Sequence, residues 1–353
     1  MSGFKANDMH IHVFNFKDLE TILEMIDEYD YEYIAVHSLS SDGGARQANN
    51  FVTVALKAML PERIFAYGSF DYPKEGGVYT PEIALEQVKN LAACGFDGVK
   101  MLEGKPNVRQ RTGISIDCGY YDLAFAYMEK EGMPLELHVA DPEEFWSRDL
   151  CPGWVAAAGY DWFTGDFVPK WKLEHEAMEV IKRFPDLKVS LAHWFFQSAS
   201  YDRTVDLFEY YPNVYLDVVP GWEMYGNFTR DYDRFRDLFI KYSDRIIYGT
   251  DNLMVNWREI ADSVQRFLKT DDSYLAGEAG LIYSDPDMLI RGINLPQDAL
   301  IKIMRENMLK FHKTPKKLDY DRILAWAKKY GEDYGNPENL EAAANKIKEG
   351  RDK

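Results

Sequence analysis

The feature that most constrains the fold of this chain is a regular alternation of short apolar runs with longer stretches of helical periodicity, which continues to about residue 312. The short runs are rich in β-branched and aromatic residues, which favour strands. The longer stretches repeat apolar residues at the spacing of amphipathic helices. Strands that alternate with helices indicate a parallel sheet with helical crossovers, so we expect an α/β fold.

Eight strands and the helices between them can be placed from this pattern. The predicted strands cover about Asp8–Val13, Tyr33–Leu39, Ile64–Phe70, Gly98–Leu102, Leu135–Val139, Val189–His193, Val214–Val218 and Ile246–Gly249. Predicted helices include Asp18–Glu28, Gln47–Met59, Pro81–Ala93, Tyr120–Lys130, Leu173–Phe184 and Tyr232–Tyr242. Eight such units predict a (β/α)8 TIM barrel. An open doubly wound sheet is the alternative, but no GxGxxG follows the first strand to support a dinucleotide site.

Three segments depart from the alternation. Asp141–Lys170, rich in Trp, Gly and Pro, forms a long loop after the fifth strand, and Asp271–Gln297 follows the eighth. Barrels carry their sites at the C-terminal ends of the strands, so both segments are expected to shape or cover the pocket. We predict a catalytic barrel domain over residues 1–312 and a C-terminal helical extension over residues 313–353, packed outside the barrel or against a neighbouring subunit.

Composition and charge exclude several classes of protein. With 353 residues and 46% hydrophobic content, the chain can bury a large core. Its net charge of -17 excludes a nucleic-acid partner, which requires clustered basic residues. The only cysteines, Cys94, Cys118 and Cys151, lie far apart and favour a reducing compartment. The N-terminus lacks a signal-peptide pattern and no apolar run is long enough to span a membrane, so we expect a soluble, cytoplasmic protein.

Histidines gather at one end of the predicted barrel. Of the seven in the chain, His10 and His12 lie on the first strand, and His138 and His193 lie at the ends of the fifth and sixth. Asp251 comes just after the eighth strand. Residues i and i+2 of a strand project to the same side, so His10 and His12 can share one ion.

Imidazole and carboxylate ligands suit Zn²⁺, and also Mn²⁺, Fe²⁺ or Co²⁺. We predict one divalent metal, with Zn²⁺ preferred, and a bound water whose pKa falls to about 7. Each residue alone has an ordinary alternative: HxH occurs by chance, His138 can be a buried polar group, and Asp251 can cap the next helix. Their joint placement at one end of the barrel favours the metal site.

Six motifs in this order and spacing resemble those of a known family. The motifs DMHIHVF, GVKML, LELHVAD, RFPDLKVSLAHW, YPNVYLDV and DRIIYGTDN are similar to those of the amidohydrolase-related metal hydrolases of the amidohydrolase superfamily, a group that also contains non-oxidative decarboxylases. The resemblance implies that His10, His12, His138 and Asp251 bind the metal and that Asp251 also accepts a proton. It implies that His193 binds a second metal or polarises the substrate.

Two positions differ from, or add to, this pattern. The family commonly has small residues after the sixth-strand histidine, whereas this chain has Trp194, Phe195 and Phe196, and we predict that Trp194 narrows the pocket or stacks on a flat substrate. Lys100 ends the fourth strand, where binuclear relatives place a carboxylated, bridging lysine. Its alternatives are binding of a substrate carboxylate or an ion pair with Glu103.

Further residues are weaker candidates. His37 ends the second strand and is predicted either to contact the substrate or to be structural. The loop arginines Arg46, Arg109 and Arg111 suit an anionic substrate, with solvated surface positions as the alternative. Asp71 and Asp217 end the third and seventh strands and can support a ligating histidine. His175 and His312 lie on predicted helices and are expected at the surface.

The leading interpretation is a metal-dependent hydrolase of a small carboxylate, lactone, ester or amide. Asp251 would activate water and carry its proton to the leaving group, while His193 would stabilise the oxyanion. The alternative is non-oxidative decarboxylation of an aromatic or dienoic acid, for which these aromatic residues would suit a flat ring: Trp194, Phe195, Trp222, Trp146, Trp154 and Trp162. A hydratase or lactonase on the same scaffold is a further alternative.

A protein that has kept the barrel but lost activity would be expected to lack a ligand or the proton-transfer residue. The five residues His10, His12, His138, His193 and Asp251 are all present. We therefore expect an enzyme with a small-molecule substrate, without nucleic-acid or membrane partners. The resemblance adds the expectation of a possible homodimer.

Overall fold

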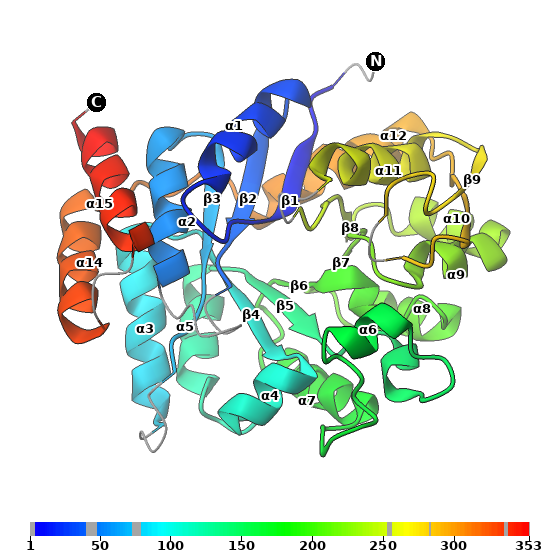
Figure 1. The fold of residues 1–353 in the computed structure, drawn as a ribbon, viewed down its shortest axis with the longest axis horizontal. Coiled ribbons are helices and arrows are strands. Elements are labelled where there is room, and N and C mark those ends of the chain that lie inside the picture. Colours follow the sequence, from blue (N-terminus) through cyan, green and yellow to red (C-terminus); the bar gives the residue numbers. More distant parts are fainter. Residues whose placement is uncertain are drawn as a thin grey trace.

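The predicted barrel is confirmed in the computed structural model, which describes residues 4–39, 48–72, 79–252, 256–281, 284–334 and 338–352. Eight parallel strands follow one another around the sheet in chain order (Figure 1). They are β1 (Asn7–His12), β2 (Tyr33–His37), β3 (Ile64–Gly68), β4 (Gly98–Gly104), β5 (Leu135–Val139), β6 (Val189–Leu191), β7 (Val214–Asp217) and β8 (Ile246–Ile247). The first and last strands meet through Met9 N, which donates to Tyr248 O at 3.1 Å, and Asp251 N, which donates to His10 O at 2.8 Å.

Helices surround this sheet. Those between or after strands are α1 (Asp18–Glu28), α2 (Ala48–Met59), α3 (Pro81–Cys94), α4 (Pro106–Thr112), α5 (Asp122–Glu131), α6 (Gly153–Ala157), α7 (Lys170–Arg183), α8 (Tyr201–Tyr210), α9 (Met224–Arg230), α10 (Tyr232–Lys241), α11 (Trp257–Lys269), α12 (Gln297–Ile301) and α13 (Asn307–Phe311). On α1 the buried residues Leu19, Ile22, Met25 and Ile26 recur at helical spacing and pack in the core. All six predicted helices are present, with ends shifted by up to three residues; Gln47 lies outside the described residues.

The two predicted insertions differ in their relation to the pocket. Residues 141–170 after β5 are largely irregular, with a 3₁₀ turn at Glu143–Trp146 and the short α6. Residues 271–297 follow α11, not β8 directly, and contain the hairpin β9 (Ser273–Leu275) and β10 (Leu289–Arg291). This hairpin packs against α9 through β10. The expectation that it covers the pocket is wrong for the described part of the chain, in which none of its residues lines the pocket.

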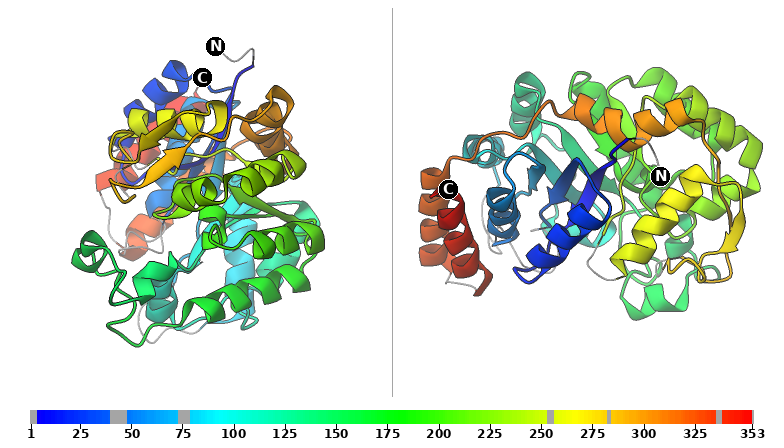
Figure 2. Two further views of the ribbon diagram at one scale, coloured as in Figure 1. Left: turned by 90° about the vertical axis from the view of Figure 1, so that its right-hand side faces the viewer. Right: turned by 90° about the horizontal axis from the view of Figure 1, so that it is seen from above.

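The C-terminal residues form α14 (Tyr320–Tyr334) and α15 (Glu338–Arg351), which pack outside the barrel against α3 and α2 (Figures 1 and 2). The rings of Phe51 on α2 and Trp326 on α14 lie 4.5 Å apart. The tail is therefore helical and lies outside the barrel, as predicted, while the domain boundary at residue 312 stays a prediction. Among the helices described, none is long and apolar enough to cross a membrane.

His312 is buried, so the prediction that it lies at the surface is wrong. It follows α13, stacks on Phe65 with ring centroids 4.3 Å apart, and its Nε2 lies 2.6 Å from the Tyr67 hydroxyl. Met308 and Phe311 on α13 belong to the same apolar cluster as Phe65 and Tyr67 on β3. The helix α13 therefore packs against the strands. Helical periodicity alone did not show which side of the element faces inward.

Candidate metal centre

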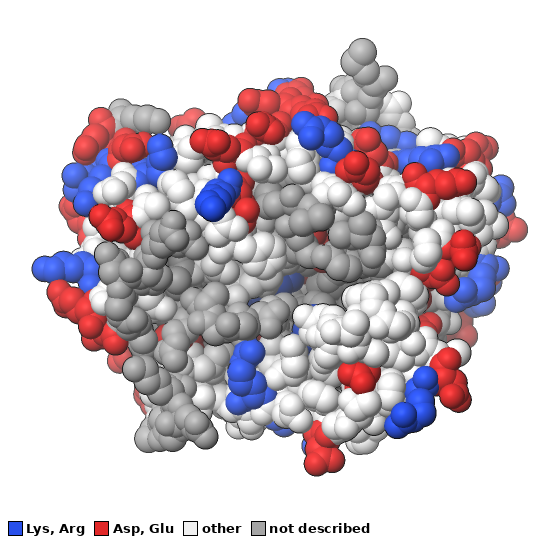
Figure 3. Space-filling model, viewed as in Figure 1, with Lys and Arg blue, Asp and Glu red and all other residues white. Residues whose placement is uncertain are grey.

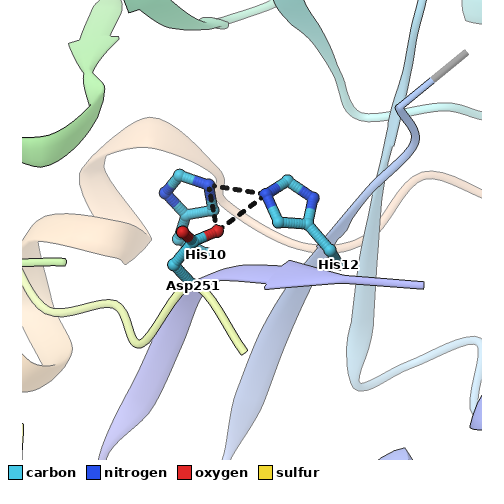
Figure 4. A group of neighbouring side chains, drawn as sticks. All are labelled: His10, His12 and Asp251. Atoms are coloured by element: carbon cyan, nitrogen blue, oxygen red, sulfur yellow. Dashed lines mark hydrogen bonds and ion pairs between the residues drawn. The ribbon is translucent and has the colours of Figure 1, made fainter. Parts of the chain in front are cut away.

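His10 and His12 from β1 and Asp251 after β8 converge at one end of the barrel. His12 Nε2 lies 2.9 Å from Asp251 Oδ1, His10 Nε2 lies 3.5 Å from the same oxygen, and the two Nε2 atoms are 3.1 Å apart. Figure 4 shows the two rings and the carboxylate facing one another. These atoms all lie within 4.8 Å of each other, the spacing of a group able to hold a metal ion. The structure thus brings together three of the four predicted ligands.

The other nitrogen of each ring has an oxygen partner. His10 Nδ1 donates to Asp217 Oδ2 at 2.8 Å, and His12 Nδ1 donates to the carbonyl oxygen of His37 at 3.3 Å. A neutral imidazole has one N–H and one lone pair, so both Nε2 atoms are left as lone-pair donors. Asp217 therefore supports His10, as expected for one of the two candidate aspartates.

Three electron-rich atoms thus point at one another: two imidazole nitrogens and a carboxylate oxygen. Such an arrangement is unfavourable unless a proton or a cation lies among them. Nitrogen and carboxylate ligands are those preferred by Zn²⁺ and are also used by Mn²⁺, Fe²⁺ and Co²⁺. The residues present therefore fit a divalent metal.

Lys100 on β4 brings a positive charge close to this group. Its Nζ lies 3.0 Å from His10 Nε2 and 3.8 Å from Glu136 Oε1, and the residue is only 1% exposed. The alternative of an ion pair with Glu103 is wrong, because the Glu103 carboxylate instead accepts a hydrogen bond from Tyr72. Lys100 also does not line the pocket, so a direct contact with substrate is not supported.

Two buried carboxyl groups lie behind His10. Burial raises the pKa of Glu136 to about 7, although Lys100 acts in the opposite direction. Burial, and then Glu136, raise the pKa of Asp217 well above its usual range. His10 Nδ1 faces both groups, at 3.6 Å from Glu136 Oε1 and 2.8 Å from Asp217 Oδ2. These groups therefore hold the ring of His10 from the side opposite to the metal centre.

His138 on β5 is not part of the close group. Its Nε2 donates to Ala140 O at 3.0 Å and lies 3.4 Å from Asp141 Oδ1. The carbonyl can only accept, so the remaining lone pair is on Nδ1. The His138 ring lies 5.0 Å from the ring of His193. Its role as a ligand stays a prediction, and with this tautomer the ligand atom would be Nδ1.

His193 begins a run of unusual backbone after β6. Residues His193, Trp194, Phe195 and Phe196 have φ between +48° and +57°, in the left-handed region. Left-handed backbone costs about 1–2 kcal/mol for each such residue. Asp217 Oδ1 accepts a hydrogen bond from His193 N at 2.7 Å, and Lys170 Nζ donates to Phe196 O at 2.9 Å. These contacts hold the strained segment in place.

The imidazole of His193 faces Asp251. Its Nδ1 donates to Pro220 O at 3.3 Å, and its Nε2 lies 3.7 Å from Asp251 Oδ2. Burial lowers the pKa of His193 to about 3, so the ring is neutral and presents a lone pair from Nε2. For Asp251, burial favours the neutral acid, but the neighbouring His12, His193 and Lys100 together outweigh burial and hold the pKa below its usual range. Asp251 is therefore a carboxylate at neutral pH.

The left-handed turn also decides which aromatic residue reaches the site. Trp194 is fully buried, stacks on Phe239 with ring centroids 4.9 Å apart, and donates from Nε1 to Thr204 Oγ1 at 3.3 Å. The prediction that Trp194 contacts substrate is therefore wrong. Phe196 lines the pocket instead, and its ring is nearly parallel to that of His193 at 5.1 Å.

A pocket of about 320 Å³ opens beside these residues. Within the described ranges it is lined by His12, Phe14, Leu39, Leu102, Lys105, His138, Asp141, Pro142, Phe145, Trp154, Tyr160, His193, Phe196, Pro220, Gly221, Trp222 and Asp251. Trp154 and Trp222 thus lie where the sequence suggested. Trp146 and Trp162 pack together in an apolar cluster and do not line the pocket, and Phe195 lies in the core. Lys105 lines the pocket but was not among the residues predicted from the sequence, although barrels place functional residues just after strands such as β4.

The remaining candidates lie elsewhere. His37 is fully buried and supports His12 through its carbonyl oxygen, so a substrate contact is not supported. Arg46 lies outside the described residues. Neither Arg109 nor Arg111 lines the pocket: the first pairs with Glu176 at 3.2 Å, and the second is exposed on α4. Asp71 does not line this pocket, and its N donates to Gln87 Oε1 at 2.7 Å. His175 is exposed on α7, as expected.

Comparison with known proteins agrees with this geometry. An amidohydrolase family model matches residues 8–311. The chain belongs to the amidohydrolase family. This membership supports a metal-dependent enzyme and confirms the family inferred from the motifs. No curated protein matches the sequence.

Solved structures share the fold at low sequence identity. An uncharacterized TIM-barrel protein from Bordetella bronchiseptica has a TM-score of 0.56 at 15% identity, covering 87% of this chain and 98% of its own. A 2,6-dihydroxybenzoate decarboxylase in complex with 2,6-dihydroxybenzoate has a TM-score of 0.55 at 15% identity, covering 88% and 99%. A dihydroxybenzoic acid decarboxylase from a Polaromonas species, with bound manganese and an inhibitor, has a TM-score of 0.51 at 15% identity, covering 88% and 97%.

Proposed function

We propose that this amidohydrolase is a metal-dependent hydrolase that directs water to a small carboxylate, lactone, ester or amide. The observation that carries the proposal is the position of Asp251, whose carboxylate lies 2.9 Å from His12 and 3.7 Å from His193 and is 20% exposed to the pocket. His10, His12 and Asp251, joined by Nδ1 of His138, would hold one divalent ion, with Zn²⁺ preferred. Such an ion supplies Lewis acidity and lowers the pKa of water to about 7.

The protein side chains account for the proton transfers. Asp251 accepts a proton from the attacking water, because its carboxylate is ionised and faces the pocket. His193 Nε2 starts as an acceptor, since its Nδ1–H is held by Pro220 O. After taking up the proton, His193 can donate it to the developing oxyanion or to the leaving group. The predicted oxyanion role of His193 therefore requires a protonation step first.

Decarboxylation of an aromatic acid is the second candidate, and the pocket walls favour it. Phe196 lies parallel to His193, and Trp154 and Trp222 face the same space with ring centroids 5.6 Å apart. Aromatic walls of this kind suit a flat ring. In this alternative, protonated His193 or Asp251 would deliver the proton that replaces the lost carboxylate.

Metal content tests the centre common to both reactions. We expect about one transition-metal ion per chain in protein purified without chelator, and its loss in His12→Ala. His175→Ala is the matched control, because it removes an exposed histidine from α7. Absence of metal from the wild-type protein even after reconstitution would contradict the proposal.

Products distinguish the two reactions. The metal-loaded protein is screened against lactones, esters, amides and hydroxybenzoates in ¹⁸O-labelled water. We expect ¹⁸O in the product acid and no CO₂, with the rate reduced at least a hundredfold in Asp251→Asn. Release of CO₂ without ¹⁸O incorporation would establish the decarboxylase instead.

A further inference from the structure

We propose that Asp8 and Thr250 are positioning residues of the metal centre. Their hydrogen bonds hold the segment that carries Asp251 against β1, which carries His10 and His12, and so set the spacing of these three side chains. The inference rests on the proposed function, since it takes the three residues to bind the metal. It adds two residues that are not among the described residues lining the pocket.

The first and last strands of the barrel meet beside the metal centre. β8 contains only Ile246 and Ile247, so the residues that follow it, up to Asp251, are not held within a strand. In the described part of the chain, single contacts join this segment to β1, such as the bridge between Ile11 and Asn252. The position of Asp251 therefore depends on individual hydrogen bonds.

Asp8 joins the two segments through its carboxylate. Its Oδ1 accepts from Thr250 N at 3.2 Å and from His10 N at 3.0 Å, and its Oδ2 accepts from Thr250 Oγ1 at 2.8 Å. Many acidic side chains lie at the surface, as the rim of the face in Figure 3 shows, but Asp8 is fully buried. Buried carboxyl groups need hydrogen-bond partners. Asp8 finds them in His10 and in the residue before Asp251, so one side chain fixes two candidate ligands relative to each other.

The segment after β8 also packs closely on β1. A Cβ atom on Gly249 would lie only 2.8 Å from the Cβ atom of His10, so glycine allows the segment to come this near. Asp251 has a φ of +53°, in the left-handed region that is uncommon for residues other than glycine. Such a conformation persists because the surrounding contacts hold it. The two hydrogen bonds between Asp8 and Thr250 are contacts of this kind, one residue away from Asp251.

Thr250→Val tests this role with little change in shape. Valine keeps the β-branched outline of threonine and removes the hydroxyl that donates to Asp8 Oδ2. Titration with Co²⁺ gives both the affinity and a visible absorption spectrum, which reports the number and arrangement of the ligands. We expect Thr250→Val to change the spectrum and to weaken Co²⁺ binding on the order of tenfold. Thr250→Ser, which keeps the hydroxyl, should restore both.

Asp8→Asn separates the position of the side chain from its charge. The asparagine oxygen can accept from both backbone N–H groups, and its NH₂ group can donate to Thr250 Oγ1. We therefore expect this variant to keep the wild-type Co²⁺ spectrum. Thr53→Val is the matched control, because it removes a buried hydroxyl on α2 that donates to Asn49 O at 2.9 Å. It should lower stability and leave the spectrum unchanged.

Hydrogen exchange of the metal-free protein adds a measurement that needs no metal. Amides in residues 246–252 should exchange faster in Thr250→Val than in the wild type or in Thr53→Val, because the segment opens more often. Unchanged exchange, or a wild-type Co²⁺ spectrum and affinity in Thr250→Val, would overturn the inference. A spectrum of Asp8→Asn that differs from the wild type as much as that of Thr250→Val would also overturn it, since charge would then be decisive.

These measurements separate this inference from the proposed function. Failure of the wild-type protein to bind Co²⁺ would count against the metal-dependent reaction. Faster exchange in Thr250→Val, but not in Thr53→Val, would in that case still support the role of Thr250 in holding the segment that carries Asp251.

Discussion

His10 Nδ1 lies 2.8 Å from Asp217 Oδ2, and both side chains are fully buried. The same carboxylate accepts a hydrogen bond from His193 N at 2.7 Å through its other oxygen. One residue at the end of β7 thus positions a candidate ligand from β1 and the histidine at the start of the strained turn after β6. Residues that hold ligating histidines in this way tune metal affinity without touching the metal.

Replacing Asp217 by Asn should therefore weaken metal binding. The amide keeps the size of the side chain, but if its oxygen keeps accepting from His193 N, its NH₂ group faces His10 Nδ1 and can no longer accept the N–H there. We expect metal affinity to fall roughly tenfold to hundredfold, measured by competition with a chromophoric chelator. Asp206→Asn, an exposed change on α8, is the control. Equal affinities in the two variants would show that Asp217 does not orient His10.

Removal of the metal should lower thermal stability. A ligand that binds only the folded state stabilises it by about 2.7 kcal/mol when present at a hundredfold excess over its Kd. We expect chelation to lower the Tm of the wild-type protein, followed by scanning calorimetry, and re-addition of metal to restore it. His12→Ala should melt at the same temperature with and without chelator. A chelator effect of wild-type size in that variant would place the stabilising metal elsewhere.

Lys100→Met should have opposite effects on stability and on metal binding. Loss of the ammonium removes the cation that counteracts burial at Glu136 and Asp217. Because both carboxyl groups can then take up a proton, the loss of stability should stay below about 3–5 kcal/mol, the cost of breaking a buried ion pair. Urea unfolding of metal-free protein measures this loss, with the exposed Lys130→Met as control. Metal affinity should rise, because the ammonium no longer lies 3.0 Å from His10 Nε2. A drop from two ions to fewer in the variant would instead indicate that Lys100 bridges metals.

Glu103 should make stability depend on pH. Burial raises the pKa of its carboxyl from 4.5 to about 7, although the Tyr72 hydrogen bond acts in the opposite direction. Between these values the folded protein keeps a proton that the unfolded chain releases, so stability falls as pH rises through this window and levels off above about pH 7. Glu103→Gln should remove this loss, which is on the order of 3 kcal/mol at most.

Urea unfolding at about pH 5 and about pH 8 checks the prediction for Glu103. The difference in unfolding free energy between the two pH values should be larger in the wild type than in Glu103→Gln. Glu62→Gln, an exposed change, should behave like the wild type. An identical pH dependence in all three proteins would show that Glu103 is ionised in the folded state.

The barrel was predictable because its signals are local. Each strand is a short apolar run, and even β8, only two residues long in the structure, lies within a predicted strand. The HxH pair was predictable for the same reason, since alternation along β1 places His10 and His12 together. Asp251 required knowledge that the first and last strands of a barrel are neighbours, which the eight-strand count supplied.

The details of the pocket depended on backbone geometry and side-chain rotation. The left-handed turn from His193 to Phe196 places Trp194 in the core and Phe196 at the pocket. No local sequence pattern predicts four successive residues with positive φ. The ring orientation of His138 is decided by Ala140 O and Asp141 after β5. The position of Lys105 in the pocket could have been predicted, because it is a cation directly after a glycine that ends a strand.

Trp162 should hold the loop after β5 in place. Its Nε1 donates to Asp141 Oδ2 at 3.0 Å, and its ring packs on Phe167 with centroids 4.8 Å apart. Trp162→Phe removes the donor and leaves the buried Asp141 carboxylate short of one hydrogen bond, at a cost of about 1–3 kcal/mol. Local opening of the loop should therefore become more frequent, and trypsin should cleave after the exposed Arg148 several times faster.

Limited proteolysis with mass spectrometry of the fragments measures this change. Trp171→Phe is the matched control, because Trp171 is 67% exposed at the start of α7, just beyond the loop. Its cleavage rate after Arg148 should equal that of the wild type. If Trp162→Phe is also cleaved at the wild-type rate, packing of the other aromatic residues, and not the bond to Asp141, holds the loop closed over the pocket.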